Sequence, residues 1–243
     1  MNKRLRILKL ALKNISGDEA LSELEGVEHR IHPGMIMAIG GAEDKTFHGK
    51  ILKKFFELSG GKGINITIVP WASEKKEAGD IYKNIFEHFG ATKIFLIKEK
   101  SREKFIDAIE RSAALFFVGG DQKRLLDELN KLDLIDDIKR ENKVGLKIGG
   151  TSAGASILGE HMIYYSSEED KTMYFKGADL IPKTIIDQHF SQRGRIQRLK
   201  DAIDRFSDCV GYGIDEDTAI VFQNGEKVLE LGSGKIIEYS VKS

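Results

Sequence analysis

The chain has 243 residues, of which 41% are apolar and 31% charged, so it can build a buried core and is too apolar for a disordered chain. Its 38 basic and 38 acidic residues balance, which leaves no cationic excess for nucleic acid, and no run of about 18 apolar residues predicts a membrane-spanning helix. The single cysteine, Cys209, excludes an internal disulfide framework and a structural zinc site of the Cys-rich kind.

The N-terminal segment is basic, with five Lys or Arg side chains before the first acidic residue. Lys9 interrupts its apolar residues, so a secretory signal, which needs an unbroken apolar centre, is not expected. We expect a basic extension or short helix over residues 1–30 and a single α/β domain over 31–243. His29 and His32 come nearest to a metal-ligand spacing, but they precede a Pro-Gly and are expected to flank a turn. The lack of a signal and the single thiol favour a cytoplasmic location.

Strands and helices alternate from about residue 35 to residue 150. Short apolar runs predict strands at 35–39, 64–69, 94–97, 114–118 and 144–148. Apolar residues at three- and four-residue spacing predict helices at 46–59 and 74–89, and further helices are expected at 101–111, after Asp121, which can cap a helix start, and at 132–141. A unit that repeats every 25–30 residues predicts a parallel sheet with helices on both faces.

The last third has a different pattern. A β-branched run at 184–186 predicts a strand, and residues 194–206 predict a helix. Four short strands are then expected at 210–214, 218–222, 227–231 and 236–241, separated by Gly-containing hairpin signals. We expect these strands to extend or finish the sheet in antiparallel fashion. The segment 162–183 contains a charged run, and no helix or strand is predicted there.

The sharpest chemical signal is Gly-Thr-Ser-Ala-Gly at 150–154, which follows a predicted strand and precedes a predicted helix start. This is the context of a nucleophile elbow, in which a tight turn exposes a serine beside a helix N-terminus. Ser152 is therefore a candidate nucleophile. A tight or phosphate-binding glycine turn is the competing interpretation of the same residues.

A nucleophilic serine needs a base and an acid that orients the base. His189 ends the polar run Asp187-Gln188-His189 after a predicted buried strand, where ligand sites of parallel sheets collect. The acids at 215–217 also follow a predicted strand, and the spacing alone leaves open which of the three faces His189. A structural histidine and a solvated acidic turn are the alternatives.

Two further clusters follow predicted strands. Arg193, Arg195 and Arg198 gather just after the candidate base, where guanidinium groups can bind carboxylates in bidentate fashion. The turn Gly119–Gln122 can supply backbone N–H groups to an oxyanion hole and the Gln122 amide to a substrate. The Gly-Gly turn at 40–41 either lines the pocket or caps a helix.

Five short motifs in this order resemble the cyanophycinase family, serine exopeptidases related to the aspartyl dipeptidase peptidase E. They are Gly-Gly-Ala-Glu-Asp-Lys at 40–45, Phe-Val-Gly-Gly-Asp-Gln at 117–122, Gly-Gly-Thr-Ser-Ala-Gly-Ala at 149–155, Asp-Gln-His-Phe-Ser-Gln-Arg-Gly-Arg at 187–195 and Gly-Ile-Asp-Glu-Asp-Thr-Ala at 213–219. The resemblance spans about residues 35–222, while 162–183 and the N-terminal 30 residues lack a recognisable counterpart.

The resemblance implies a three-layer α/β/α sandwich, flavodoxin-like and related to class I glutamine amidotransferase domains, that forms a homodimer. It implies Ser152 as nucleophile, His189 as base and Glu216 as orienting acid, with the N–H groups of Ala153 and Gly120 as the oxyanion hole. The matching substrate-pocket positions are Gln122, Asp187, Gln188, Arg193, Arg195 and Arg198. The implied substrate is cyanophycin, a poly-aspartate with arginine on each β-carboxylate, and the implied product is the β-aspartyl-arginine dipeptide. No metal or organic cofactor is implied.

Two alternatives remain from the sequence. An aspartyl dipeptidase-like enzyme would keep the same catalytic groups and act on short acidic peptides. A small-molecule binding protein of the same fold would keep the pocket without the chemistry. Neither alternative needs nucleic acid or a membrane as partner.

Overall fold

The computed structural model describes residues 33–166 and 171–241, so the basic extension expected over 1–30 and the pair His29 and His32 lie outside the described residues. The strands are β1 (Ile36–Ile39), β2 (Asn65–Val69), β3 (Lys93–Leu96), β4 (Ala114–Phe117), β5 (Lys147–Thr151), β6 (Gly159–Ser166), β7 (Lys171–Lys176), β8 (Ile181–Gln188), β9 (Val210–Ile214), β10 (Thr218–Gln223), β11 (Glu226–Gly232) and β12 (Ile236–Tyr239). The helices are α3 (Lys50–Leu58), α4 (Ala78–Phe89), α5 (Arg102–Glu110), α6 (Gln122–Lys131), α7 (Ile135–Lys143), α8 (Ala153–Ser156) and α9 (Ile196–Arg205), with a 3₁₀ turn at Ser191–Arg193.

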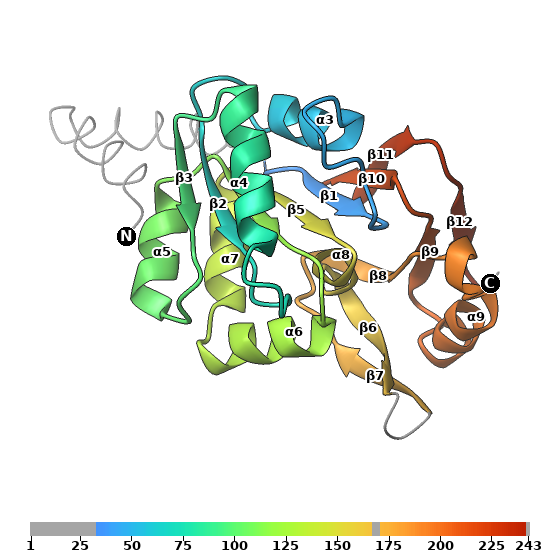
Figure 1. Cartoon of the computed structure of the whole chain (residues 1–243). Helices are drawn as coiled ribbons and strands as arrows, with labels where there is room; N and C mark the ends of the chain where they lie inside the picture. The colour runs from blue at the N-terminus through green and yellow to red at the C-terminus, as the bar shows by residue number, and fades with distance from the viewer. Residues whose placement is uncertain (1–32, 167–170, 242–243) are drawn as a thin grey trace, which may run out of the picture.

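The main sheet is mostly parallel, as the repeating strand and helix pattern predicted. Its strand order is β11-β10-β1-β5-β4-β2-β3 (Figure 1). The five strands from β1 to β3 in this order run parallel to one another, whereas β10 pairs antiparallel with β1 and β11 pairs antiparallel with β10. The hairpin β10–β11 turns at Asn224-Gly225, where both residues have positive φ angles of 54° and 82°. The expected α/β fold with a central parallel sheet is therefore confirmed.

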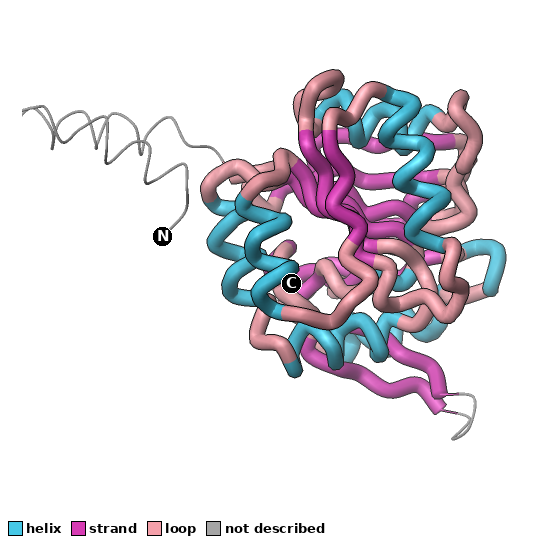
Figure 2. Tube along the Cα trace, turned by 60° about the vertical axis from the view of Figure 1, so that its left-hand side comes forward, coloured by secondary structure: helices cyan, strands magenta, loops and turns pink. Residues whose placement is uncertain are grey.

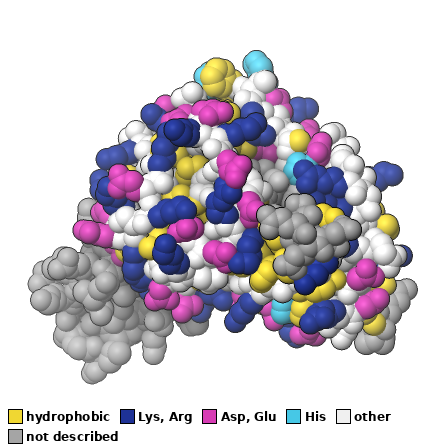
Figure 3. Space-filling model, turned by 60° about the horizontal axis from the view of Figure 1, so that its bottom comes forward, with side chains coloured by type: hydrophobic (Ala, Val, Ile, Leu, Met, Phe, Trp, Pro, Cys, Tyr) yellow, Lys and Arg dark blue, Asp and Glu magenta, His cyan; other side chains and the backbone are white. Residues whose placement is uncertain are grey.

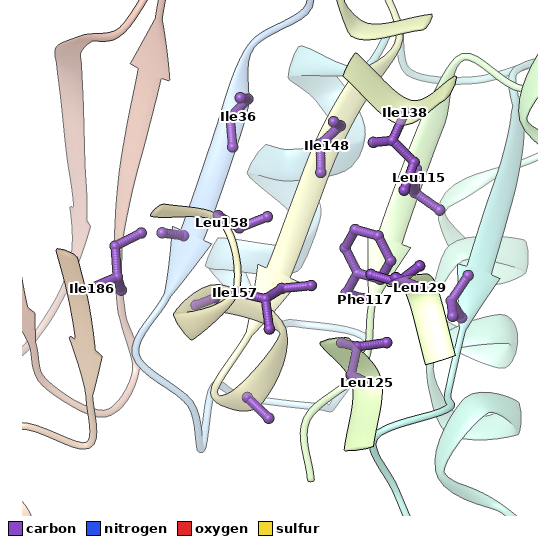
Figure 4. Close-up of a cluster of buried hydrophobic side chains, with 14 of the residues drawn as sticks. Ile36, Leu115, Phe117, Leu125, Leu129, Ile138, Ile148, Ile157, Leu158 and Ile186 are labelled. Carbon is purple, nitrogen blue, oxygen red and sulfur yellow. The ribbon is translucent and has the colours of Figure 1, made fainter. Parts of the chain in front are cut away.

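Helices cover both faces of this sheet, as Figure 2 shows with the sheet seen nearly edge-on. On β1, Met37 and Ile39 pack with the apolar stripes of α3 and α4, whereas Ile36 and Ala38 pack with those of α5, α6 and α7. Successive side chains of a strand point to opposite faces, so one buried strand serves two cores. Figure 4 shows the second of these cores, where Phe117 lies among Leu125 and Leu129 of α6.

The expectation for the four late strands is confirmed for β10 and β11, which extend the first sheet in antiparallel fashion, and is wrong for β9 and β12, which lie in a second sheet of order β12-β9-β8-β6-β7. In it β9 and β6 run parallel to β8, and only β7 and β12 are antiparallel to their neighbours. The segment 162–183 was not assigned from sequence, and it contains most of β6 and all of β7. Met162 and Ile163 are both buried, one on each face, so the apolar and polar alternation that marks a half-buried strand is missing.

Element boundaries differ from the predictions where side chains make local turns. The helix expected from residue 46 begins at Lys50, because the Asp44 carboxylate accepts a hydrogen bond from the Thr46 amide at 2.8 Å and holds a turn. The strand expected at 144–148 lies three residues later, after α7 ends and Gly145 adopts a φ of 105°. The helix after Ser152 is confirmed but has only four residues.

Five strands bring their carboxyl ends to one edge of the molecule. Ser152 follows β5, the Gly119–Gly120 turn follows β4, and the Gly40–Gly41 turn follows β1. His189 follows β8 and the acids at 215–217 follow β9, so the second sheet supplies two of these five strand ends. The His189 amide donates to the Gly40 carbonyl at 2.8 Å, which ties the two sheets together at this edge.

The surface has no dominant charge on the face that Figure 3 shows, where Lys and Arg side chains lie among Asp and Glu. This fits the balanced net charge of the whole chain. No helix in the described part of the chain is long and apolar enough to cross a membrane.

Candidate active site

Ser152 occupies a strained turn between β5 and α8. Its φ and ψ are 52° and −113°, a left-handed backbone that costs a non-glycine residue on the order of 1–3 kcal/mol. A Cβ on Gly150 would lie 2.2 Å from the Gly154 carbonyl oxygen, so the flanking glycines are what allow the chain to turn this tightly. The Ser152 amide donates to the Ile39 carbonyl at 2.9 Å, which holds the strained turn against β1.

Ser152, His189 and Glu216 form a chain of hydrogen bonds. The Ser152 Oγ lies 2.9 Å from His189 Nε2, and His189 Nδ1 lies 2.6 Å from Glu216 Oε1. His189 also has a positive φ of 48°, and the ring occupies the space in front of Gly41. A Cβ on Gly41 would lie 2.4 Å from His189 Nε2, so any side chain at that position would displace the ring.

The three acids that the sequence left open have three different partners. Only Glu216 contacts the His189 ring. Asp215 is buried and accepts from the backbone amides of Ser191 and Lys235, at 2.9 and 3.0 Å. Asp217 has a positive φ and accepts from the Asp44 amide at 3.2 Å. Asp215 and Asp217 therefore shape the loops around Glu216.

The pKa of His189 is held below its ordinary value of 6.5. Burial of the ring is the largest cause, and the positive charges of Arg193 and Arg195 act in the same direction. Hydrogen bonding to Glu216 and its negative charge oppose this lowering. The imidazole is therefore neutral at pH 7 and able to accept a proton from the Ser152 hydroxyl.

A cavity of about 670 Å³ opens beside Ser152, and we call it the arginine cavity. Polar and charged residues predominate in its lining: Ser73, Glu74, Lys75, Asp121, Gln122, Arg124, Ser152, Tyr164, Tyr165, Gln188, Arg193, Arg195 and Arg198, together with Ala72, Gly119 and Gly120. The three arginines predicted from the sequence thus lie on the wall of one hollow with the candidate nucleophile. Such a lining suits a charged, polar ligand.

Asp187 anchors two of these arginines from beneath the cavity. Its side chain is 1% exposed and accepts from Arg195 Nη1 at 3.2 Å and from Arg198 Nε at 2.6 Å, with a second bond from Arg198 Nη2. Burial lowers the pKa of Arg195 to about 10, which still leaves its guanidinium protonated at pH 7. Arg193 is exposed and has no ion-pair partner among residues 33–166 and 171–241, so its charge is available to a ligand.

The remaining predicted residues also lie at this edge. The Gln122 side chain donates to the Ile163 carbonyl at 3.0 Å, and the Gln188 side chain accepts from the Ser152 hydroxyl at 3.4 Å. Gly120 adopts a φ of 148° in the turn after β4. Ala153 is the first residue of α8, where backbone N–H groups lack partners within the helix.

The sequence missed one buried group behind this site. The Glu43 side chain is fully buried and accepts from the Tyr82 hydroxyl and the Thr151 hydroxyl, each at 2.6 Å. Burial, followed by the negative charge of Glu43, raises the pKa of Tyr82 far above its ordinary value, so Tyr82 is the donor. Thr151 directly precedes Ser152, so Glu43 braces the turn. The sequence singles out the motif at 40–45 but assigns no role to Glu43 within it.

The comparison with known protein families identifies the family of this chain. The model of peptidase family S51 matches residues 35–230, which is most of the chain. The chain belongs to peptidase family S51. It is therefore a serine-type peptidase, and Ser152, at the strained turn, lies within the matched range.

Curated members of this S51 group match over most of the chain. A cyanophycinase from Geminocystis herdmanii (strain PCC 6308) is 37% identical over 213 residues, which cover 83% of this chain and 78% of the relative. A cyanophycinase from Trichormus variabilis (strain ATCC 29413 / PCC 7937) is also 37% identical, with coverage of 83% and 72%. A peptidase E from Actinobacillus pleuropneumoniae serotype 5b (strain L20) is 24% identical over 196 residues, with coverage of 76% and 82%.

Solved structures share the S51 fold. A peptidase from an acI-B1 Actinobacterium superposes with a TM-score of 0.62 at 20% identity, covering 86% of this chain and 98% of that one. A putative peptidase E from Listeria monocytogenes EGD-e gives the same TM-score at 18% identity, with coverage of 86% and 100%. At these identities the likeness establishes the fold.

Proposed function

We propose that this S51 peptidase hydrolyses cyanophycin and releases β-aspartyl-arginine dipeptides. The observation that carries the proposal is the hydrogen-bonded chain from Ser152 through His189 to Glu216, which lies against the arginine cavity. The similarity to cyanophycinases over four-fifths of the chain supports the choice of substrate.

In the proposed mechanism Ser152 is the nucleophile and His189 the general base. As Oγ attacks the carbonyl carbon, its proton passes to His189 Nε2, and Glu216 at Nδ1 stabilises the imidazolium that forms. The C–N bond then breaks, and Nε2 returns the proton to the leaving amine. Water repeats the sequence on the acyl-enzyme, with His189 again as base, and frees Ser152.

The tetrahedral oxyanion is assigned to two backbone N–H groups, those of Ala153 and Gly120. Ala153 N–H lies at the start of α8, where the helix dipole also favours negative charge. Gly120 follows a glycine whose missing Cβ would lie 3.1 Å from the Ser152 Cβ, so the turn can approach the nucleophile closely.

The charges of the arginine cavity suit a zwitterionic substrate. Each cyanophycin unit has a free arginine α-carboxylate and a guanidinium. Arg193 is placed to bind the carboxylate, while Arg195 and Arg198, held by Asp187, keep the wall positive. Gln122 and Gln188 offer amide groups to the peptide, and carboxylates for the guanidinium are present on the same wall.

The assembly and location are part of the same proposal. We infer a cytoplasmic homodimer from the family resemblance and from the single thiol, which is buried. Residues 31–243 are inferred to form one domain, which is supported by a core that contains Ile36 and Ile148 of the first sheet together with Ile186 and Ile214 of the second. Light scattering of the purified chain tests the dimer.

The test is incubation with insoluble cyanophycin, in parallel with a Ser152→Ala variant. We expect the wild type alone to clear the suspension and to release β-aspartyl-arginine, detected by mass spectrometry. The rate of hydrolysis should fall by about 10⁴-fold or more in the variant. Absence of product from both proteins contradicts the cyanophycin assignment.

A second substrate class is favoured by one comparison. Peptidase E relatives match over 76% of the chain. The arginine cavity has more cationic than anionic side chains, which also suits a short acidic peptide. A panel of aspartyl dipeptides assayed beside the polymer separates the two substrates, because a dipeptidase would cleave the panel and leave the polymer intact.

A further inference from the structure

A second cavity, of about 420 Å³, adjoins the first at Ser152. The two share Lys75, Gly119, Gly120 and Ser152. The rest of the second lining is Ala42, Lys45, Glu77, Ala78, Ile81, Tyr82, Val118, Thr151 and His189. Family membership and the proposed roles above leave this hollow unassigned.

His189 distinguishes the two hollows, because it lines the second cavity and not the arginine cavity. The imidazolium formed during acylation must pass its proton to the leaving nitrogen, so the leaving group has to lie next to His189 Nε2. The side of the scissile bond that becomes the acyl-enzyme then occupies the arginine cavity. The side that departs occupies the second cavity.

Two lysine side chains line the second cavity together with the apolar residues Ala78, Ile81 and Val118. Lys45 Nζ lies 3.6 Å from the buried Glu43 carboxylate and 5.9 Å from the centre of the Tyr82 ring, and its side chain is 37% exposed. Lys75 is exposed and forms no ion pair within the described ranges 33–166 and 171–241. Glu77 is the one carboxylate among the lining residues, and Ile81 presents apolar surface at 40% exposure.

We propose that the second cavity is the leaving-group subsite and that Lys75, assisted by Lys45, binds a carboxylate of the departing unit. This inference rests on the proposed function. Every β-aspartyl-arginine unit carries the arginine α-carboxylate, and a unit at the carboxyl end of the polymer carries a second one, so a departing terminal unit offers two carboxylates to these lysines. The reaction is the one already written: the C–N bond breaks, the acyl group stays on Ser152 Oγ, and the leaving nitrogen takes the proton from His189.

The test compares two substrates that share one acyl unit, a dimer of β-aspartyl-arginine and the p-nitroanilide of the same unit. The p-nitroanilide departs without a carboxylate. A Lys75→Met variant should lower kcat/KM for the dimer about tenfold or more beyond any loss on the p-nitroanilide, the difference expected for a charge-assisted hydrogen bond to the departing unit. Lys76→Met is the matched control, because Lys76 is exposed beside Lys75 and lines neither cavity.

A second measurement uses the reverse direction. By microscopic reversibility, added β-aspartyl-arginine attacks the acyl-enzyme from the leaving-group subsite. The concentration of this acceptor that gives half-maximal aminolysis should rise in Lys75→Met and stay constant in Lys76→Met. This readout does not depend on how the acyl unit binds.

Each outcome bears on one claim. An equal loss on both substrates would place Lys75 on the acyl side and overturn the subsite, as would unchanged kinetics on both. If the wild type cleaves cyanophycin but Lys75→Met affects the dimer and the p-nitroanilide equally, the subsite is overturned and the proposed function stands. Wild type that cleaves none of these substrates overturns the proposed function and the subsite with it.

Discussion

Glu43 and Asp187 are both buried carboxylates behind the cavities at Ser152, yet the donors that hydrogen-bond to them differ in charge. Glu43, 2% exposed, accepts hydrogen bonds from two neutral hydroxyls, those of Tyr82 and Thr151, and has the Lys45 ammonium at 3.6 Å. Asp187, 1% exposed, accepts from two guanidinium groups, those of Arg195 and Arg198. The first carboxylate braces the nucleophile turn, and the second positions a cationic wall.

The difference predicts unequal tolerance to loss of charge. A hydroxyl can donate or accept, so the partners of Glu43 can adapt to an amide. A guanidinium can only donate, so the partners of Asp187 cannot adapt. Removing one member of a buried ion pair also leaves its partner's charge uncompensated.

The largest effect is expected for Asp187→Asn. Two partly buried guanidinium groups lose their counter-charge, and the free energy of unfolding should fall by about 3–5 kcal/mol. Denaturant unfolding measures the loss. The matched variant Asp201→Asn removes an exposed carboxylate on α9 and should change stability by less than about 0.5 kcal/mol. A loss below about 1 kcal/mol in Asp187→Asn would show that the arginines do not depend on this charge.

Next in size is the pair Glu43→Ala and Glu43→Gln. Alanine leaves two buried hydroxyls without an acceptor and should cost about 2–4 kcal/mol of unfolding free energy. Glutamine keeps an acceptor oxygen, so it should cost less than half as much. Equal losses from the two variants would mean that the charge of Glu43, rather than its hydrogen bonds, is what the fold requires.

A smaller effect is expected for Tyr82→Phe. Glu43 keeps the Thr151 hydroxyl as donor, so the loss in unfolding free energy should be about 1–2 kcal/mol. The double variant Tyr82→Phe with Glu43→Gln then reports the coupling between the two groups. Strictly additive losses would contradict a shared hydrogen bond.

The smallest effect is a shift in pH dependence. Only neutral His189 accepts the serine proton, and its pKa lies below 6.5, so kcat/KM should persist below pH 6.5 and fall as pH drops through that pKa. Arg193→Gln removes a positive charge that lowers this pKa, so the acid limb should move to higher pH. Glu43→Gln should leave the limb in place. The pH dependence of the rate at which a serine-directed inhibitor modifies Ser152 measures this acid limb independently of substrate binding. An acid limb that moves in Glu43→Gln and stays in place in Arg193→Gln would contradict the prediction.

The sequence predicted the parallel sheet and the residues at strand ends because glycine turns and buried β-branched runs are local signals. It could not choose among the acids at 215–217, because only the docking of β9 against β8 brings Glu216 to His189. It missed the hairpin β6–β7, which is buried on both faces at Met162 and Ile163. It gave no role to Glu43, whose partner Tyr82 is 39 residues away.

The buried Cys209 makes the protein a convenient carrier for a single optical label. It is the one cysteine of the chain, its side chain is 2% exposed, and burial raises the pKa of its thiol to about 11. At neutral pH almost no thiolate is present, so maleimide dyes should react with it slowly. A dye attached through a Lys75→Cys substitution would stand where the two cavities meet. Its fluorescence would then report the arrival and departure of peptide in real time.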